Sequence, residues 1–299
     1  MKAYNLEMLP RQAEPGPDCH GWVFGLPPGI TREQWPLDPN NGYPLMHGFT
    51  LLLPEDYRVH GPENVALSFF ATAPDHCDGA FFEVEGARSE VEAMQDHSRP
   101  HRMLDILGCE YALILLTQLE FYGRLCQPPE PLVETNRKPD WMTMGAAASY
   151  WKMTGLNQYE QESQLKLTFG GKPPPDVTYN RAARWTPRNS DPNAGVPPRE
   201  SWACDSEGYQ SYFYWAEDPT AISTDTEEGR QRIQDAFRIR DWAKDHKDAH
   251  IGGTMRPVQN IPAFSPYYVE FDEYFGGYNF GGGNAQLDFR DMKFDWACG

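Results

Sequence analysis

The stretch YYVEFDEYFGGYNFGGGNAQLDFRDMKFDW, residues 267–296, holds two segments in which apolar and polar residues alternate, joined by a glycine-rich connection. Alternation with a period of two is typical of half-buried antiparallel strands. The connection at 274–286 contains five glycines and four aromatic residues. It therefore predicts a hairpin in which glycine provides positive φ angles or close backbone approach. The alternative is a recognition surface formed by exposed Tyr274, Tyr278 and Phe280.

The same connection lacks the pattern of a phosphate-binding loop. A P-loop needs GxxxxGK[ST], but Gly277 and Gly282 are followed by Gly283 and Asn284, with no lysine. Acidic residues flank the stretch, and they would repel an anion. We therefore expect no nucleotide at this position.

Outward along the chain, short apolar runs at 47–54 and 64–74 are bounded by turn-forming residues and predict buried strands. Tyr111–Gln118 is expected to be a further strand. Small and large apolar residues at helical spacing predict a helix at 141–155. A second helix is expected at 223–250, where the periodicity is clearest.

The helix expected at 223–250 carries start and stop signals. Thr224 and Glu227 fit a capping box, and Gly252 is expected to end the helical pattern. Four residues are expected to share its apolar face: Ile233, Ala236, Phe237 and Trp242.

Proline punctuates the rest of the chain. The segment 171–200 is proline-rich and predicts a long loop, which carries the basic cluster Arg181, Arg184 and Arg188. Residues 1–299 are expected to form a single domain. The fold class that these patterns predict is α+β, with antiparallel β-sheets, a few packed helices and long Pro/Gly-rich loops.

The charge balance excludes some partners. Asp and Glu number 43 against 26 Lys and Arg, a net charge of −17. This field repels nucleic acid and anionic membranes and steers basic partners toward the chain, although acidity also serves solubility alone. No apolar run of membrane-spanning length occurs, and the N-terminal residues lack the apolar core of a signal peptide. We expect a cytoplasmic protein whose six scattered cysteines are reduced and mostly buried.

The histidines and cysteines do not fit a metal site. Cys19-His20 and His76-Cys77 are adjacent pairs, whereas zinc ligands are usually separated by two to five residues. His246 and His250 are four apart but lack the intervening glutamate of HExxH, so we expect them to be ordinary surface histidines. We therefore predict no metal and no cofactor.

No pattern nominates a catalytic residue. GxSxG is absent, and the carboxylates are so abundant that pairing any two as acid and base would be arbitrary. The sequence therefore favours a protein that is not an enzyme. A hydrolase with a composite site of carboxylates and histidines stays open as an alternative, because catalytic geometry is spatial. A deep pocket with His20 or His76 beside acidic residues would favour it.

Separated segments carry a family resemblance. FGLPPGITREQWPLDPNNGYPLMHGFTLLLPED, residues 24–56, has a Gly-Leu-Pro start, a Trp-Pro step, a Gly-x-Pro-Leu step and a strand ending in Leu-Pro. HIGGTMRPVQ, 250–259, and GGGNAQLDFRDMKFDWACG, 281–299, are similar to later glycine-rich segments and closing strands. Together they resemble the YwqG-like domain family. The chain departs from that pattern at Met255-Arg256 and in Leu-Pro-Pro where a Gly-Gly pair is usual.

The resemblance implies an α+β domain built on antiparallel sheets, in a bacterial family that supplies no catalytic residues. Members of such families are often immunity or accessory proteins beside secreted toxins. The resemblance and the acidity together favour a cytosolic immunity protein that occludes a basic antibacterial toxin, delivered by a contact-dependent system such as type VI secretion. A carbohydrate-binding module, favoured by the tryptophans and tyrosines, is a further alternative that a row of exposed tryptophans would support.

For the toxin-binding surface we predict acidic and aromatic residues of two segments. The C-terminal hairpin contributes Glu270, Asp272, Glu273, Tyr274 and Tyr278. A second acidic segment contributes Glu217, Asp218, Asp225 and Glu228. A few aromatic residues would provide most of the affinity, and the acidic residues would accelerate association.

Overall fold

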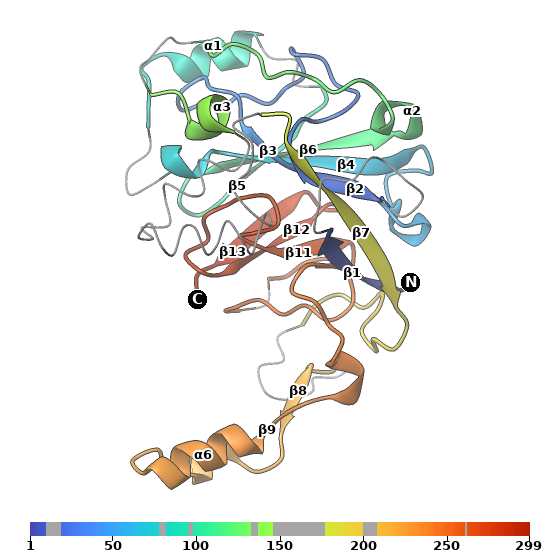
Figure 1. Cartoon of the computed structure of the whole chain (residues 1–299), viewed down its shortest axis with the longest axis vertical. Helices are drawn as coiled ribbons and strands as arrows, with labels where there is room; N and C mark the ends of the chain where they lie inside the picture. The colour runs from blue at the N-terminus through green and yellow to red at the C-terminus, as the bar shows by residue number, and fades with distance from the viewer. Residues whose placement is uncertain are drawn as a thin grey trace.

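The structure, a computed structural model, is dominated by one antiparallel sheet of eleven strands in the order β13-β12-β11-β10-β1-β7-β2-β3-β4-β6-β5 (Figure 1). The described residues are 1–9, 19–77, 82–94, 98–132, 137–145, 177–199, 208–260 and 262–299. The strands of this sheet are β1 (Ala3–Met8), β2 (Gly21–Phe24), β3 (Met46–Leu52), β4 (Asn64–Ala71), β5 (His101–Leu104), β6 (Glu110–Thr117), β7 (Asn180–Arg188), β10 (His250–Ile251), β11 (Tyr268–Asp272), β12 (Asn284–Asp288) and β13 (Lys293–Ala297).

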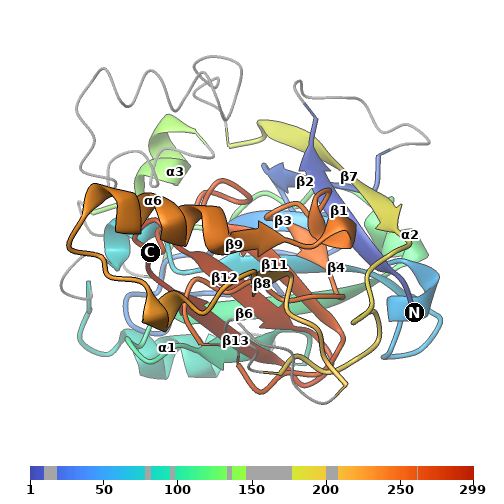
Figure 2. The same ribbon diagram turned by 90° about the horizontal axis from the view of Figure 1, so that it is seen from below.

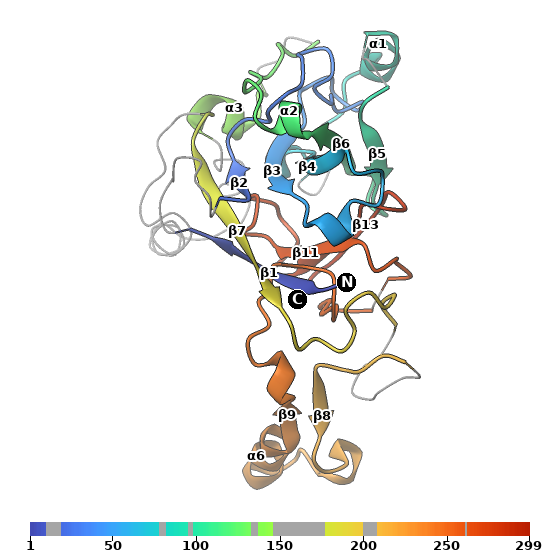
Figure 3. The same ribbon diagram turned by 90° about the vertical axis from the view of Figure 1, so that its right-hand side faces the viewer.

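The sheet folds back on itself into two packed layers, and β7 belongs to both of them. This strand pairs with β1 in one layer and with β2 in the other (Figure 3). Aromatic rings fill the space between the layers. The ring of Phe49 on β3 lies 5.1 Å from that of Phe271 on β11, and Tyr111 on β6 stacks 3.9 Å from Phe294 on β13. The hydrophobic core therefore joins the N-terminal and C-terminal parts of the chain.

The apolar runs at 47–54 and 64–74 form β3 and β4, as predicted, and both strands are buried along almost their whole length. Each is covered on two faces. Phe69 of β4 packs on Phe271, whereas its neighbour Phe70 packs on Trp35 on the other face. The predicted strand at Tyr111–Gln118 is also confirmed, since β6 covers nearly the same residues. Continuous apolar runs thus mark strands that have no solvent face.

Helices contribute less than an α+β class implies, so that prediction is confirmed only for its antiparallel sheet. In the described part of the chain the α-helices are α1 (Ala87–Met94), α2 (Gln118–Phe121), α3 (Asp140–Met144) and α6 (Glu227–Ala236). The longest has ten residues. None of these helices is long and apolar enough to cross a membrane.

The prediction of a helix at 223–250 is wrong in its start and its length, because α6 covers only Glu227–Ala236. Thr226, rather than Thr224, caps α6 by accepting a hydrogen bond from the Gly229 amide. The helix ends at Ala236 because Phe237 begins β9 (Phe237–Ile239), which pairs with β8 (Phe213–Trp215). Packing of Phe237 on the rings of β8 replaces helical periodicity there.

Two other segments differ from expectation. α3 covers the beginning of the helix predicted at 141–155, and residues 146–155 lie outside the described part of the chain. Within the predicted loop 171–200, β7 occupies Asn180–Arg188 in the middle of the sheet. The basic cluster is therefore on a strand, where Arg181 and Arg188 are buried. Tertiary pairing with β1 and β2 outweighs the proline content.

The glycine-rich connection joins the antiparallel strands β11 and β12, as the alternation predicts. The expectation that these strands are half-buried is wrong, because both of their faces are buried and their polar residues Glu270, Gln286 and Asp288 lie in the interior. Its aromatic residues do not form an exposed surface. Tyr278 and Phe280 are 2% and 1% exposed, and both rings pack on Phe271. Gly48 is required opposite them, because a Cβ there would overlap the Tyr278 hydroxyl. Glycine thus allows close approach, and the alternative of an exposed recognition surface is wrong for Tyr278 and Phe280, whereas Tyr274 is half-buried.

The prediction that the cysteines are all reduced is also wrong. Cys77 and Cys109 form a disulfide across a sequence separation of 32 residues. Cys19, Cys126 and Cys298 are free, and among these Cys126 is buried and Cys298 exposed. Cys204 lies outside the described residues. Scattered cysteines in the sequence became neighbours because β4 and β6 pair in the sheet.

Candidate binding site

A projecting arm, defined as residues 213–239 and formed by β8, α6 and β9, extends from the two-layered body (Figures 1 and 3). Its base is held by hydrogen bonds. Asn193 binds Gln210 through both its side-chain oxygen and nitrogen, at 2.9 and 2.7 Å, and the Met255 amide donates to the Tyr209 hydroxyl at 2.9 Å. In the view from below, α6 and β9 stand in front of the two-layered body, because the arm projects toward the viewer (Figure 2).

A cavity of about 600 Å³ lies between the base of the arm and the β11–β12 connection. We call it the acidic cavity, because four of its lining residues are carboxylic acids: Asp248, Glu270, Asp272 and Glu273. Aromatic rings from both sides complete the wall: Tyr212, Phe213, Trp215, Phe237 and Tyr274. Among the described lining residues Arg256 is the one basic side chain. A concave apolar site with a few convergent polar groups is the usual form of a ligand site.

Asp272 is the carboxylate best placed to meet a ligand. Its Oδ1 accepts hydrogen bonds from the Tyr274 and Phe275 amides, both at 3.0 Å. Within the described structure its Oδ2 has no hydrogen-bond or ion-pair partner. The pKa of Asp272 is raised to about 6, mainly by burial and also by the neighbouring charges of Asp248 and Glu273, while the two hydrogen bonds oppose the shift. The acidic cavity therefore holds carboxylates that repel one another.

Glu270 forms the floor of the acidic cavity and is fully buried. Its two carboxylate oxygens accept from the Arg256 amide at 3.1 and 2.9 Å, and the Gln286 amide group donates to Oε2 at 3.3 Å. Burial nevertheless raises its pKa to about 8. Near neutral pH this residue is therefore mostly protonated, which leaves Asp272 as the charged group of the β11 strand.

The aromatic wall already binds a cation from the chain itself. The Arg256 guanidinium lies 4.4 Å from the centre of the Tyr212 ring and donates to the His246 carbonyl at 3.4 Å. Arg240 similarly lies 5.3 Å from the centre of the Tyr214 ring on the arm. Planar cations are attracted to aromatic faces by the ring quadrupole. The wall is thus chemically suited to a second cation.

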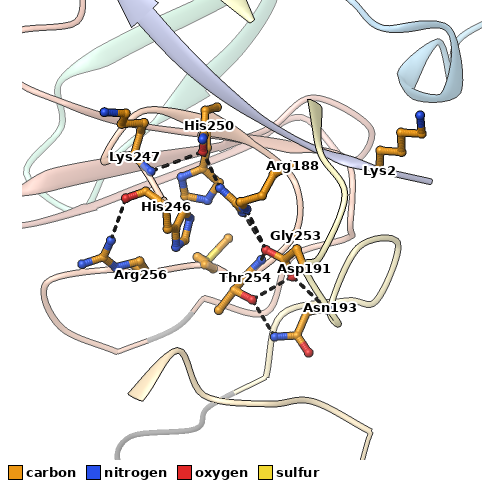
Figure 4. Close-up of polar contacts among 12 residues, drawn as sticks. Lys2, Arg188, Asp191, Asn193, His246, Lys247, His250, Gly253, Thr254 and Arg256 are labelled. Carbon is orange, nitrogen blue, oxygen red and sulfur yellow. Dashed lines mark hydrogen bonds and ion pairs between the residues drawn. The ribbon is translucent and has the colours of Figure 1, made fainter. Parts of the chain in front are cut away.

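A buried polar network supports the acidic cavity from behind (Figure 4). Asp191 accepts from Arg188 Nε and Nη2 at 3.1 and 2.6 Å and from the Thr254 amide and hydroxyl at 2.9 Å each. Arg188 also donates to Asn5 on β1 at 2.7 Å. Gly253 is required here, because its φ is +84° and a Cβ would lie 2.6 Å from Asp191 Oδ2. The HIGGT segment thus orients the next residues toward the cavity.

His246 and His250 are buried beside this network, with ring centres 4.4 Å apart. Burial lowers the pKa of both well below the usual value, and the charges of Arg188 and Arg256 lower it further. His250 Nδ1 lies 3.9 Å from Glu270 Oε1. Both rings are therefore neutral, and the prediction of ordinary surface histidines is wrong at these two positions.

The structure brings together four of the nine residues predicted for partner binding. Glu270, Asp272, Glu273 and Tyr274 all line the acidic cavity. Glu273 also shapes the connection, since its Oε1 accepts from the Phe280 and Gly282 amides. The fifth hairpin residue, Tyr278, is buried in the core and lines a different cavity. Glu273 thus both stabilises the connection and lines the acidic cavity.

The other four predicted residues lie on the arm outside the acidic cavity. Glu217 pairs with Arg232, and Asp218 caps a short turn by accepting from Thr220 at 2.9 Å. Asp225 accepts from the Ser223 hydroxyl at 3.3 Å, and Glu228 is exposed near the start of α6. They are acidic residues of the arm and do not belong to the cavity lining.

Sequence reasoning missed the residues that complete the acidic cavity. Asp248 and Arg256 come from the segment before and after β10, and Trp215 and Phe237 come from the arm. The cluster of aromatic residues around Trp215 was a signal for part of this site. No local pattern connects that cluster with Asp248, because the contact is made only in the folded chain.

The features that would have favoured other functions lie elsewhere. His20 stacks on Trp185 at 3.8 Å, and His76 Nε2 donates to the Arg137 carbonyl at 2.8 Å; neither lines the acidic cavity. None of the tryptophans in the described ranges is exposed. Across the same ranges, no group of three or more His, Cys, Asp or Glu residues is placed to hold a metal ion.

No protein-family model matches the chain. Neither a curated protein nor a solved structure matches it. The resemblance to the YwqG-like family therefore stays a prediction, and the function is argued from the site itself.

Proposed function

We propose that this protein binds a basic protein partner by taking a cationic side chain into the acidic cavity. The observation that carries the proposal is Asp272, a half-buried carboxylate that lines the aromatic-walled cavity and whose Oδ2 has no partner among the described residues. A guanidinium or ammonium group would neutralise the mutual repulsion of Asp272, Asp248 and Glu273. Hydrogen bonds to a charged group contribute about 1.5–3 kcal/mol.

Two further features support a protein rather than a free small cation as the ligand. The net charge of −17 would accelerate association with a basic surface. The arm also carries acidic residues that would meet positive charges on the partner's surface: Glu217, Asp218, Asp225 and Glu228. The arm offers Tyr214 and Ile239, exposed by 42% and 45%, as apolar contacts.

The partner class that we propose is a cognate antibacterial toxin, delivered by a contact-dependent secretion system and bound in the cytoplasm of the cell that makes the immunity protein. An acidic protein that inserts into, or covers, a basic active site neutralises an enzyme that acts on anionic substrates such as nucleic acid. The predicted YwqG-like relationship agrees with this class of function.

The test is co-expression with the products of the neighbouring genes, scored for growth rescue and for a co-purifying complex. The matched variants are Asp272→Asn, which removes the cavity charge, and Glu90→Gln on α1, at the end of the molecule opposite the arm (Figure 1). We expect rescue by the wild type and by Glu90→Gln, and an affinity about 10- to 100-fold lower for Asp272→Asn. Neither complex nor rescue with any neighbouring product would contradict the proposal.

A hydrolase remains the second candidate because Glu270 and Asp272, with pKa values raised to about 8 and about 6, line one cavity. Groups whose proton affinities differ in this way suit a general acid and a general base. Screening the purified chain for hydrolysis of glycosides, esters and phosphoesters tests it. Activity that is lost in both Glu270→Gln and Asp272→Asn would favour the enzyme over the binding protein.

A further inference from the structure

A second cavity, of about 220 Å³, is lined by three cysteines that come from different parts of the chain. We call it the cysteine cavity. Cys77 and Cys109, which form the disulfide, share its wall with the free thiol of Cys298. The rings of Tyr278 and Trp296 complete much of the rest. A nucleophilic thiol and a disulfide thus open onto the same small space.

Asp105 holds the cysteine-bearing segments in place. It follows β5, and its Oδ1 accepts from the Cys109 amide at 2.9 Å. Its Oδ2 accepts from the Tyr111 hydroxyl at 3.0 Å and from the Trp296 indole at 2.7 Å. One carboxylate therefore connects the segment that carries the disulfide to β13, which ends one residue before Cys298.

The three sulfurs differ in accessibility. Cys298 is exposed, Cys77 is half-buried and Cys109 is 7% exposed. The Gln259 side chain donates to the Cys298 carbonyl at 3.0 Å and lies 3.7 Å from its sulfur. These contacts fix the end of the chain at the edge of the cavity. Of the two cysteines in the disulfide, Cys77 is the more exposed residue.

We propose that the cysteine cavity is a thiol–disulfide exchange site. The Cys298 thiol loses its proton to solvent, and the thiolate attacks the Cys77 sulfur. A Cys77–Cys298 bond forms while the Cys77–Cys109 bond breaks, and Cys109 leaves as a thiolate that takes up a proton. The disulfide moves within the chain, so the step needs no external oxidant or reductant.

The exchange changes which parts of the fold are tied together. The Cys77–Cys109 bond ties the short 3₁₀ helix Pro74–His76 to the start of β6, whereas a Cys77–Cys298 bond ties it to the end of β13. β6 and β13 lie in opposite layers of the core, where Tyr111 stacks on Phe294. In a cytosolic protein a disulfide is usually transient, catalytic or redox-sensing. A disulfide that moves between two partners is transient in this sense. The exchange does not depend on the proposed binding function.

The experiment maps disulfides during incubation of the whole chain. Protein purified without reductant at mildly acidic pH is shifted to about pH 8.5, where thiolates are abundant. Samples are quenched with acid, alkylated with N-ethylmaleimide, digested and analysed by mass spectrometry. We expect a Cys77–Cys298 peptide to accumulate while Cys109 becomes alkylated. Cys298→Ser should keep the Cys77–Cys109 pair alone, and Cys19→Ser, which removes a free thiol elsewhere, should exchange as the wild type does.

If the equilibrium strongly favours the Cys77–Cys109 disulfide, too little of the Cys77–Cys298 form would accumulate to be detected. A second variant tests the proposal in that case. In Cys109→Ser, treatment with oxidised glutathione should form the Cys77–Cys298 bond, because both thiols open onto one cavity. The proposal is overturned if Cys77–Cys109 is the sole linkage in the wild type and Cys77–Cys298 also fails to form in Cys109→Ser. It is equally overturned if Cys77 and Cys109 are both alkylated at the start, or if Cys298 pairs with another molecule instead.

Discussion

Replacement of Asp272 by asparagine should make the folded chain more stable while it weakens partner binding. Burial raises the pKa of this carboxyl from 3.8 to about 6. Each tenfold change in proton affinity corresponds to about 1.4 kcal/mol, so the ionised carboxylate destabilises the folded chain by about 3 kcal/mol above pH 6. Asparagine removes this charge and keeps Oδ1 as the acceptor for the Tyr274 and Phe275 amides.

The sign depends on pH. The folded state holds the Asp272 proton more tightly than the unfolded chain does, so the free energy of unfolding falls as pH rises from about 4 to about 6. The variant should lack this decrease. Because a neutral amide oxygen is a weaker acceptor than a carboxylate, we expect a net gain of about 1–2 kcal/mol at neutral pH. The gain should largely disappear near pH 4, where the wild-type carboxyl is protonated in the folded state and about half protonated in the unfolded chain.

Urea unfolding followed by tryptophan fluorescence, at about pH 4, 5.5 and 7.5, measures the difference. Glu90→Gln on α1 is the control, because this exposed side chain lies far from the acidic cavity and should change the free energy of unfolding by less than about 0.5 kcal/mol. A loss of stability in Asp272→Asn at pH 7.5 would refute the electrostatic argument. So would a gain of the same size at pH 4.

Three further changes test the framework of the site. Gly253→Ala should lower the free energy of unfolding by at least about 2 kcal/mol, because the alanine would be strained at positive φ and its Cβ would also overlap Asp191. Gly86→Ala, with the same φ of +84° and no atom within 4 Å, should cost about 1–2 kcal/mol in the same urea experiment; equal losses would argue against the overlap. Glu270→Gln should flatten the fall in stability that the wild type shows as pH rises toward 8, and an unchanged pH profile in urea would contradict the raised pKa. Asp191→Asn should lower the free energy of unfolding by about 3–5 kcal/mol, because it leaves the buried Arg188 guanidinium without its charge partner; a loss below about 1 kcal/mol in thermal or urea unfolding would show that the network is dispensable.

Local patterns predicted much of the sheet. The runs that became β3, β4 and β6 are apolar throughout, and the segments that became β11, β12 and β13 alternate. In both cases the residues that face the core are neighbours or next-neighbours in sequence, so the pattern is visible before folding. Local signals failed where distant contacts compete with them, as at Phe237, which leaves the helical periodicity to pair with Trp215.

The candidate site was predicted in part for the same reason. Glu270, Asp272, Glu273 and Tyr274 are consecutive or nearly so, and an acidic hairpin is visible in a sequence. Their burial was not visible, and burial is what raises the pKa of Asp272 and removes Tyr278 from the surface. Whether a side chain of one layer is exposed depends on which residues of the opposite layer pack on it.

The sequence by itself determined the antiparallel strands, the acidic character of the chain and the glycine-rich connection, because each depends on residues close together along the chain. Only the tertiary structure decided that Asp248, Asp272 and Trp215 line one cavity and that Cys77, Cys109 and Cys298 line another. These groups meet because an eleven-stranded sheet folds into two layers and pairs its N-terminal strand with β7 and β10. Such long-range pairing is set by the summed packing of the core, which no single stretch of sequence encodes.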